Sequence, residues 1–283
     1  MLTVAIVYCD KDAKYVPNLI RNINECVQPS HEIVLVDNTT RGTPIDGGTY
    51  YWMGGNKYAT QGRKKAVELA KGEYIWFVDA DDEVYELKDF DFTEDMIVYG
   101  YEITGNPRLH GMSPEGEFVV EDEWLFKYTT YNYMERTLWN KIIRTSIVRE
   151  VESLIPDTWL CVAGEDVLLY TACYCKCKKV RFKPDVIYRF RADLSTSGSK
   201  SMTCEKFRHI LNGCKETNAL LKELIGDKAD KFGYTDNYVR DIGYYFGRLD
   251  DAVDEKTMKE MLDILCEYFG TKKVVAAING SAD

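Results

Sequence analysis

The first third of the chain alternates between short apolar runs and amphipathic segments, and this order constrains the fold more than any other feature. The apolar runs at 3–8, 32–37 and 74–78 have the length and composition of buried parallel strands. Apolar residues at helical spacing over 15–27 predict one helix between them, and the segment 59–70 predicts a second. This βαβαβ order indicates an α/β fold with a parallel sheet covered by helices. Ligands are expected at the carboxyl ends of its strands.

Three aspartates directly follow the third apolar run, in the sequence Asp79-Ala80-Asp81-Asp82. Residues two apart on an extended segment point to the same side, so Asp79 and Asp81 can face one ligand together. Carboxylates suit Mg²⁺ or Mn²⁺, and such ions commonly bridge one or two carboxylates to substrate phosphates. Taken alone, the motif is weak evidence for a metal, and a solvated acidic turn is the better interpretation.

The rest of the chain is less regular up to a Ser/Gly-rich linker at 195–199, beyond which the apolar pattern is helical only. We therefore expect an α/β domain over residues 1–200 and a small helical appendage over 201–283. The elements expected before the linker are strands at 96–101, 138–143, 180–182 and 186–190, a helix at 165–175, and a hairpin or irregular excursion at 104–118.

The composition of the chain limits which partners it is expected to bind and in which compartment it is expected to occur. The chain carries 36 basic and 46 acidic side chains, a formal net charge of −10, and an acidic surface repels the phosphates of nucleic acid. No apolar run approaches the roughly 18 residues that a membrane span needs, and the first residues lack a signal peptide, so we expect a cytoplasmic protein. The nine cysteines are then expected to be reduced thiols. A basic run at 176–183 is compatible with a peripheral contact at the inner face of a membrane and with a solvated face.

Four segments, taken in order, resemble family 2 glycosyltransferases of the GT-A fold, a Rossmann-like fold of nucleotide-diphospho-sugar transferases. Tyr8 ends the first strand, and 32–38 looks like the second strand of that family. The stretch 60–82 is similar to the helix and strand that lead into the family's metal motif. Trp139-Asn140-Lys141-Ile142-Ile143 and Gly164-Glu165-Asp166 resemble its acceptor-side motifs. The resemblance covers roughly residues 1–198, and its order and spacing make it specific.

The resemblance implies a single in-line displacement that inverts the anomeric carbon. A sugar would move from a nucleotide-diphosphate donor, most often a UDP-sugar, to the hydroxyl of a glycan or lipid-linked saccharide of the cell envelope. Mn²⁺ or Mg²⁺ is the implied metal, and a homodimer is compatible with the sequence. The implied roles are nucleotide binding by Tyr8, Asp37, Arg63, Asp79, Arg189 and Arg191, metal binding by Asp81 with Asp79 and with Asp82 as a substitute, general base by Asp166 or Glu165, and acceptor binding by Trp139 and Asn140.

Other interpretations of these residues remain open. Glu165 and Asp166 also fit simple capping of a helix N-terminus, since carboxylates are favoured there. Trp139 fits a core position, and the pair Arg189 and Arg191 fits a surface position at a strand end.

The sequence also departs from the family pattern. Cys9 stands where the family usually has Asn, and the loop 41–55 is longer than usual. Both departures bear on the identity of the donor. A sugar-1-phosphate nucleotidyltransferase is a competing function, but no glycine lies between Tyr8 and Ala13, where that family has a Gly-rich phosphate loop. A catalytically silent protein that binds a nucleotide or a glycan is a second alternative.

Overall fold

The structure is a computed structural model that describes residues 1–88, 93–104, 118–121, 137–159, 165–194, 203–226 and 254–278. These residues form two compact units. The described residues up to 194 make up the first unit, and those from 203 onward make up the second.

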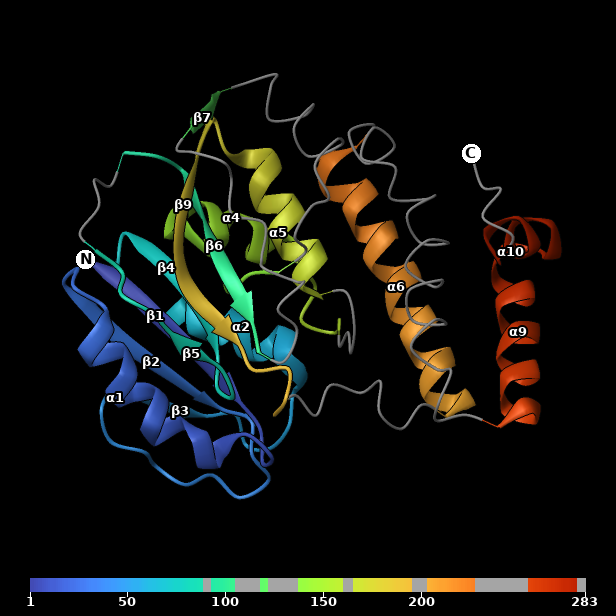
Figure 1. The fold of residues 1–283 in the computed structure, drawn as a ribbon, viewed down its shortest axis with the longest axis horizontal. Helices are drawn as coiled ribbons and strands as arrows, with labels where there is room; N and C mark the ends of the chain where they lie inside the picture. Colours follow the sequence, from blue (N-terminus) through green and yellow to red (C-terminus); the bar gives the residue numbers. More distant parts are fainter. Residues whose placement is uncertain are drawn as a thin grey trace. The chain divides into compact units, whose positions relative to one another are not determined.

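The first unit is built on one mixed sheet in the order β3-β2-β1-β4-β8-β6-β9-β5, with β7 paired to β9 (Figure 1). The first four strands of this order are parallel: β1 (Leu2–Tyr8), β2 (His31–Asp37), β3 (Thr49–Trp52) and β4 (Tyr74–Asp79). The remaining strands are β5 (Glu83–Val84), β6 (Met96–Ile103), β7 (Phe118–Glu121), β8 (Lys141–Arg144) and β9 (Lys179–Phe190). β8 runs antiparallel to β4 and β6, β6 and β9 are parallel, and β5 and β7 are antiparallel to β9. The parallel βαβαβ order predicted for the first third is confirmed.

Helices cover both faces of this sheet. Successive side chains of each buried strand point to opposite faces, so both faces carry apolar side chains that need cover. On one face, α1 (Val16–Cys26), which follows the short 3-10 helix η1 (Ala13–Tyr15), packs in a core with the even-numbered residues of β1. On the other face, α2 (Tyr58–Leu69) packs on β1, β2 and α4 (Thr145–Leu154). α5 (Glu165–Lys176) packs in turn on α4 (Figure 1). The result is a layered α/β/α unit, as the sequence pattern predicts.

Three strand predictions need correction. β3 lies inside the segment that the sequence presents only as a Gly-rich loop, because its residues are exposed or half-buried and lack an apolar pattern. β9 is a single strand rather than two, with an irregular register to β6 around Gly100. β8 begins at Lys141, three residues later than predicted. Residues 105–117 of the predicted excursion lie outside the described residues.

Gly62 allows α2 to approach the sheet closely. A Cβ atom at this position would lie 2.4 Å from Cγ1 of Val7 and 2.8 Å from Nδ2 of Asn38. Such distances are too short for non-bonded carbon atoms, so only glycine fits without movement of the neighbours. The helix α2 therefore packs at short distance on β1 and β2, and the next residue, Arg63, lies close to the sheet.

The second unit consists, in its described part, of α6 (Cys204–Ile225), α9 (Glu255–Phe269) and α10 (Thr271–Ile278). Apolar side chains of the predicted helical stripes, such as Phe207 and Leu211 on α6 and Met261 and Leu265 on α9, form its core. α9 begins at a cap in which the backbone N–H of Thr257 donates to Oδ1 of Asp254 at 2.7 Å. Among the described residues of both units, no helix combines the length and the apolar character needed to cross a membrane.

Candidate active site

The parallel register brings three predicted site residues to the same edge of the sheet. Tyr8 at the end of β1 pairs with Asp37 at the end of β2, and Val7 pairs with Asp79 at the end of β4. The carboxyl ends of these strands therefore carry Tyr8, Asp37 and Asp79 side by side. Crevices at such strand ends are the usual ligand sites of open α/β sheets.

Asp79 and Asp81 form the part of the acidic motif that remains open to a ligand. The side chain of Asp79 is 41% exposed, and Asp81 is half-buried. The pKa of Asp79 is raised to about 6, because burial and then the charge of Asp81 outweigh the lowering effect of Arg63. Burial also raises the pKa of Asp81, and the charge of Asp12 adds to this. These carboxylates thus repel one another at one place, and a bound cation would relieve that repulsion.

The donor set fits an ion that takes few ligands from the protein. Within the ranges that the structure describes, no group of three or more His, Cys, Asp or Glu side chains is placed to hold a metal. Mg²⁺ typically binds through one or two carboxylates and completes its shell with water and substrate phosphates. Asp79 and Asp81 suit that arrangement.

Asp82 has a different environment from its two neighbours. It is 5% exposed, and its Oδ2 accepts from the hydroxyl of Tyr188 at 2.5 Å while its Oδ1 accepts from the backbone N–H of Arg191 at 2.7 Å. Burial and the charge of Asp79 raise the pKa of Asp82 to about 8. Both carboxylate oxygens of Asp82 therefore accept hydrogen bonds from β9 and the residue after it, which join this segment to the turn at residues 79–82. The role of Asp82 as a substitute metal ligand stays a prediction, and it would require these two bonds to break.

Arg63 connects the acidic motif to the predicted base. Its buried guanidinium lies with Nη1 2.6 Å from Oδ1 of Asp166 and 3.3 Å from Oε1 of Glu165, and with Nη2 3.9 Å from Oδ1 of Asp79. Burial opposes the charge on Arg63, but the three carboxylates outweigh it and raise its pKa above the ordinary value. One cation thus joins residues from β4 and α5.

Asp166 is poised to exchange a proton near neutral pH. It lies in the first turn of α5, where the helix dipole favours an anion, and its side chain is 29% exposed. The pKa of Asp166 is raised to about 7. Burial raises it most and the charges of Glu165 and Asp79 add to this, while Arg63 and Lys141 lower it. A group with such a pKa can accept a proton at neutral pH and still drive its transfer, as general bases do.

Asp37 is occupied by its own loop. It is fully buried, and its carboxylate accepts from the backbone N–H groups of Thr39 at 2.7 Å and Thr43 at 3.1 Å and from the hydroxyl of Tyr50 at 2.6 Å. The buried hydroxyl of Tyr8 has no hydrogen-bond partner among the described residues. Nucleotide binding by Asp37 stays a prediction, and the Tyr8 hydroxyl is the unsatisfied polar group beside it.

The two predicted phosphate-binding arginines lie at the end of β9 and already have carboxylate partners. Arg189 contacts Glu102 at 2.6 Å and Glu83 at 3.1 Å. Arg191 contacts Glu83 at 2.5 Å and Asp193 at 3.0 Å. Binding a diphosphate would require these arginines to exchange partners, so their predicted role stays a prediction.

The predicted acceptor residues lie in the interior. Trp139 is 7% exposed, with its ring stacked on Tyr188 at 4.6 Å between centroids and in edge contact with Tyr101 at 4.4 Å. Asn140 is fully buried, and its Nδ2 donates to the backbone carbonyl of Tyr99 at 2.9 Å. This packing supports the core interpretation of Trp139, and acceptor binding by either residue stays a prediction.

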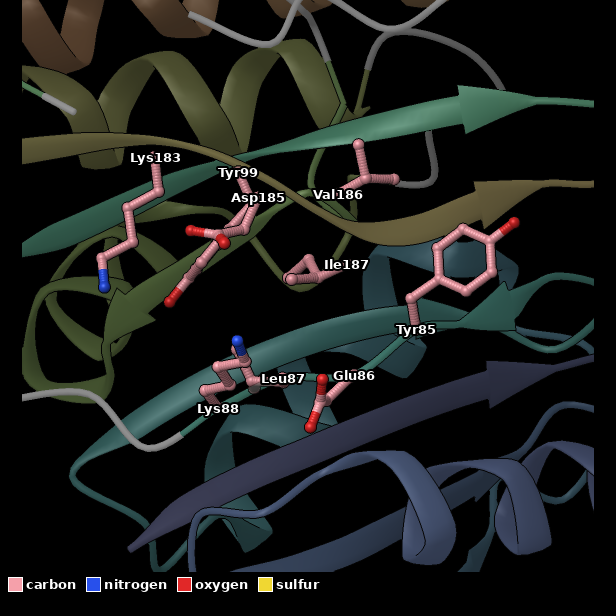
Figure 2. A pocket seen from close by; sticks show the side chains of 9 residues that line it. All are labelled: Tyr85, Glu86, Leu87, Lys88, Tyr99, Lys183, Asp185, Val186 and Ile187. Atoms are coloured by element: carbon pink, nitrogen blue, oxygen red, sulfur yellow. The ribbon is translucent and has the colours of Figure 1, made fainter. Parts of the chain in front are cut away.

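A separate cavity of about 470 Å³ lies between the segment after β5 and the middle of β9. Figure 2 shows side chains of residues 85–88 on one side of it and side chains of β9 on the other. It includes none of the predicted site residues. Its lining residues are Tyr85, Glu86, Leu87, Lys88, Tyr99, Lys183, Asp185, Val186 and Ile187.

Several residues around the site carry no recognisable signal in the sequence. Asp12, whose charge acts on Asp79 and Asp81, follows β1 in a polar loop with no motif. Tyr188, which links Asp79 and Asp82 through its hydroxyl, looks like an ordinary strand residue in the sequence. Lys141 belongs to a quoted motif, but nothing in the sequence marks it as buried.

Comparisons with known proteins agree on the family and the fold. The sequence model described as Glycosyl transferase family 2 matches residues 3–147, slightly more than half of the chain. No curated protein matches the sequence. Among solved structures, TarS 1–349 of S. aureus in complex with UDP-GlcNAc matches with a TM-score of 0.58 at 17% identity, over 100% of this chain and 90% of that chain. The complex of the same protein with UDP gives a TM-score of 0.57 at 16% identity, again over 100% and 90%. These likenesses show the GT-A fold, and the family match shows that the chain belongs to glycosyl transferase family 2.

Proposed function

We propose that the chain is a metal-dependent, inverting transferase that moves a sugar from a nucleotide-diphosphate donor to the hydroxyl of an acceptor. The observation that carries the proposal is the contact of Arg63 with both Asp79 and Asp166. It supports a single site in which a cation-binding carboxylate and a proton acceptor lie on either side of one guanidinium. A transferase of this kind needs both groups at the reacting bond.

Asp79 and Asp81 are the residues proposed to hold Mn²⁺ or Mg²⁺. Once bound, the ion supplies Lewis-acid stabilisation of the diphosphate as negative charge develops on it. The half-buried setting of the two carboxylates supports this role, because electrostatic interactions are stronger where water is partly excluded.

Asp166 is the proposed general base, and Glu165 is the alternative. The acceptor oxygen forms a bond to the anomeric carbon while the bond from that carbon to the diphosphate oxygen breaks. The diphosphate leaves with the electron pair, and the acceptor proton passes to the Asp166 carboxylate. The pKa of about 7 supports Asp166 in this role. Inversion follows from such a single displacement.

The nucleotide would lie along the strand ends, with its base near Tyr8 and Asp37 and its diphosphate near Asp79. A UDP-sugar is the proposed donor, supported by the fold shared with a protein crystallised with UDP and with UDP-GlcNAc. Arg189 and Arg191 are proposed to reach the diphosphate after they exchange partners. The proposed acceptor is a glycan or lipid-linked saccharide of the cell envelope.

The organisation and setting of the protein are also proposals. Residues 1–200 are proposed to carry the reaction, and residues 201–283 to form a helical appendage. A cytoplasmic location, with a peripheral contact at the inner face of a membrane, would suit a lipid-linked acceptor.

Donor turnover with Mn²⁺ separates this function from its two alternatives. The protein would be incubated with a panel of nucleotide sugars, with and without EDTA, and the products would be separated by anion exchange. Release of a nucleoside diphosphate that EDTA abolishes is the expected result. Release of pyrophosphate from a nucleoside triphosphate and a sugar 1-phosphate would instead indicate a nucleotidyltransferase. Binding without turnover by any donor would indicate a silent binding protein.

A further inference from the structure

Lys141 is a charged side chain in the interior of the first unit. It is the first residue of β8 and is 1% exposed. Its ammonium donates to the backbone carbonyl of Thr137 and to Oδ1 of Asn140, both at 2.6 Å, and lies 4.4 Å from the centroid of the Tyr170 ring. Fully buried lysines are rare because desolvation of the charge is costly. An apolar side chain would fill the same space at a lower cost, so the charge itself calls for an explanation.

The position of Tyr170 relates this charge to the predicted base. Tyr170 lies on α5, four residues after Asp166, and residues four apart share one face of a helix. The ammonium that contacts the Tyr170 ring therefore lies on the face of α5 that carries Asp166. In agreement with this placement, the charge of Lys141 lowers the pKa of Asp166.

Charged groups from four elements act on Asp166. They are Arg63 from α2, Asp79 from β4, Glu165 from α5 and Lys141 from β8. Arg63 is shared among three carboxylates, because it also contacts Glu165 and Asp79. A second buried cation on a different element adds to the effect of Arg63, and both oppose the rise in the pKa of Asp166 that burial causes.

We propose that Lys141 is a positioning residue whose buried charge, held against the Tyr170 face of α5, favours the ionised form of the Asp166 carboxylate. It acts through Asp166 and the Tyr170 face of the helix and does not itself touch the substrate. The description of Asp166 as the base rests on the proposed function. The electrostatic link between the two side chains does not.

The direct test is the titration of the Asp166 carboxyl carbon by ¹³C NMR in the metal-free protein, with the signal assigned from its loss in Asp166→Asn. The variants are Lys141→Met, Lys141→Gln and Lys141→Arg. Both neutral variants should raise the pKa of Asp166 above the wild-type value, as expected for loss of an opposite charge. Lys141→Arg should leave it near the wild-type value. Lys183→Met is the matched control, because Lys183 also lies over a tyrosine ring, that of Tyr99 at 6.0 Å, but on β9.

A purely structural lysine would give a different result. It would lower the melting temperature in the neutral variants without moving the pKa of Asp166, and that result would overturn the proposal. Loss of folding in both neutral variants, with Lys141→Arg folded, would assign the lysine to stability and would also overturn it.

The pH dependence of kcat/KM separates the two proposals. If Asp166 is the base, the rising limb of the profile should move upward with the NMR pKa in Lys141→Met and stay in place in Lys141→Arg. A shift of the NMR pKa in a protein that releases no nucleoside diphosphate would support the role of Lys141 and reject the proposed function.

Discussion

The guanidinium of Arg63 lies 2.6 Å from the carboxylate of Asp166, although the two residues come from opposite halves of the sequence. The same guanidinium reaches Asp79 at 3.9 Å. Arg63 therefore fixes the distance between the acidic motif of β4 and the first turn of α5. Its place depends on the close approach of α2 to the sheet at Gly62.

Replacing Arg63 should damage both stability and turnover. Arg63→Met leaves three partly exposed carboxylates without their cation. Its cost should therefore lie below the roughly 3–5 kcal/mol of a fully buried ion pair, because solvent screens part of the charge. Arg63→Lys keeps the charge but loses the planar fork that spans several carboxylates, so turnover should fall while most of the stability remains. Urea unfolding and nucleoside diphosphate release measure the two effects. Lys71→Met, at an exposed position just after α2, is the control and should change the free energy of unfolding by at most about 0.5 kcal/mol. Wild-type behaviour of Arg63→Met would contradict the account.

Asp81 and Asp82 are adjacent, but substitution should destabilise the protein only at Asp82. Asp82→Ala removes the acceptor of the Tyr188 hydroxyl and of the Arg191 N–H, so it should cost about 1–3 kcal/mol for each donor left unsatisfied. Asp81→Ala should leave the metal-free protein as stable as the wild type, since it relieves repulsion with Asp79. Thermal unfolding in EDTA tests this difference.

The same two variants should differ in their response to ligand. Mn²⁺ with UDP should raise the melting temperature of the wild type by mass action and should still raise that of Asp82→Ala. It should have no effect on Asp81→Ala. A ligand response that survives in Asp81→Ala and is lost in Asp82→Ala would reverse the assignment of the metal ligand.

Much of this arrangement can be predicted from the sequence, and the parts that cannot be predicted have identifiable physical reasons. The strand ends that carry Asp37 and Asp79 are predictable because continuous apolar runs mark buried parallel strands. β3 is not predictable from its pattern, because Tyr51 and Trp52 are exposed on an edge strand. The engagement of Asp37 by its own loop depends on side chains up to Tyr50 folding back, which has no local signature.

The burial of charged residues is the second gap between sequence and structure. Arg63 and Lys141 look like surface residues in the sequence, yet both are buried against partners distant in the chain. Only the contacts of Arg63 with Asp166 and of Lys141 with Tyr170, both on α5, reveal that the two cations act on the same carboxylate. The family resemblance identifies Asp166 as a candidate base, but only the structure shows that Arg63 and Lys141 act on it.

Glu152 should make the stability of the protein fall as pH rises. It is 4% exposed on α4, its Oε2 has no hydrogen-bond partner among the described residues, and burial raises its pKa to about 7. Between its ordinary pKa of 4.5 and about 7, the folded state binds more protons than the unfolded state, so stability decreases with pH over this range. The loss should be on the order of 3 kcal/mol. Glu152→Gln should reduce this slope and stabilise the protein at pH 8.

Urea unfolding at pH 5 and pH 8 measures the effect. Glu150→Gln is the matched control, because Glu150 lies on the same helix with a 56% exposed side chain paired to Lys176. It should leave the slope unchanged. An equal slope in Glu152→Gln and the wild type would show that Glu152 does not titrate in this range.

Gly62→Ala should destabilise the first unit through steric contacts, of which that with Val7 is the shortest. The added Cβ would lie 2.4 Å from Cγ1 of Val7, and overpacking of this kind typically costs about 1–3 kcal/mol. The displaced α2 should also carry Arg63 away from Asp166 and lower turnover. The double variant Val7→Ala with Gly62→Ala removes the clashing methyl group and should recover part of both losses. Two losses that simply add in the double variant would place the strain elsewhere.

A crystal structure with UDP and Mn²⁺ bound would show whether the acidic motif binds a metal ion next to the proposed base. We expect a cation held by Asp79 and Asp81, with diphosphate oxygens completing its shell and the Asp166 carboxylate facing the place where the sugar would lie. Nucleotide bound away from the ends of β1, β2 and β4, for instance in the cavity of Figure 2, would contradict it. So would a diphosphate bound with no cation at these two aspartates.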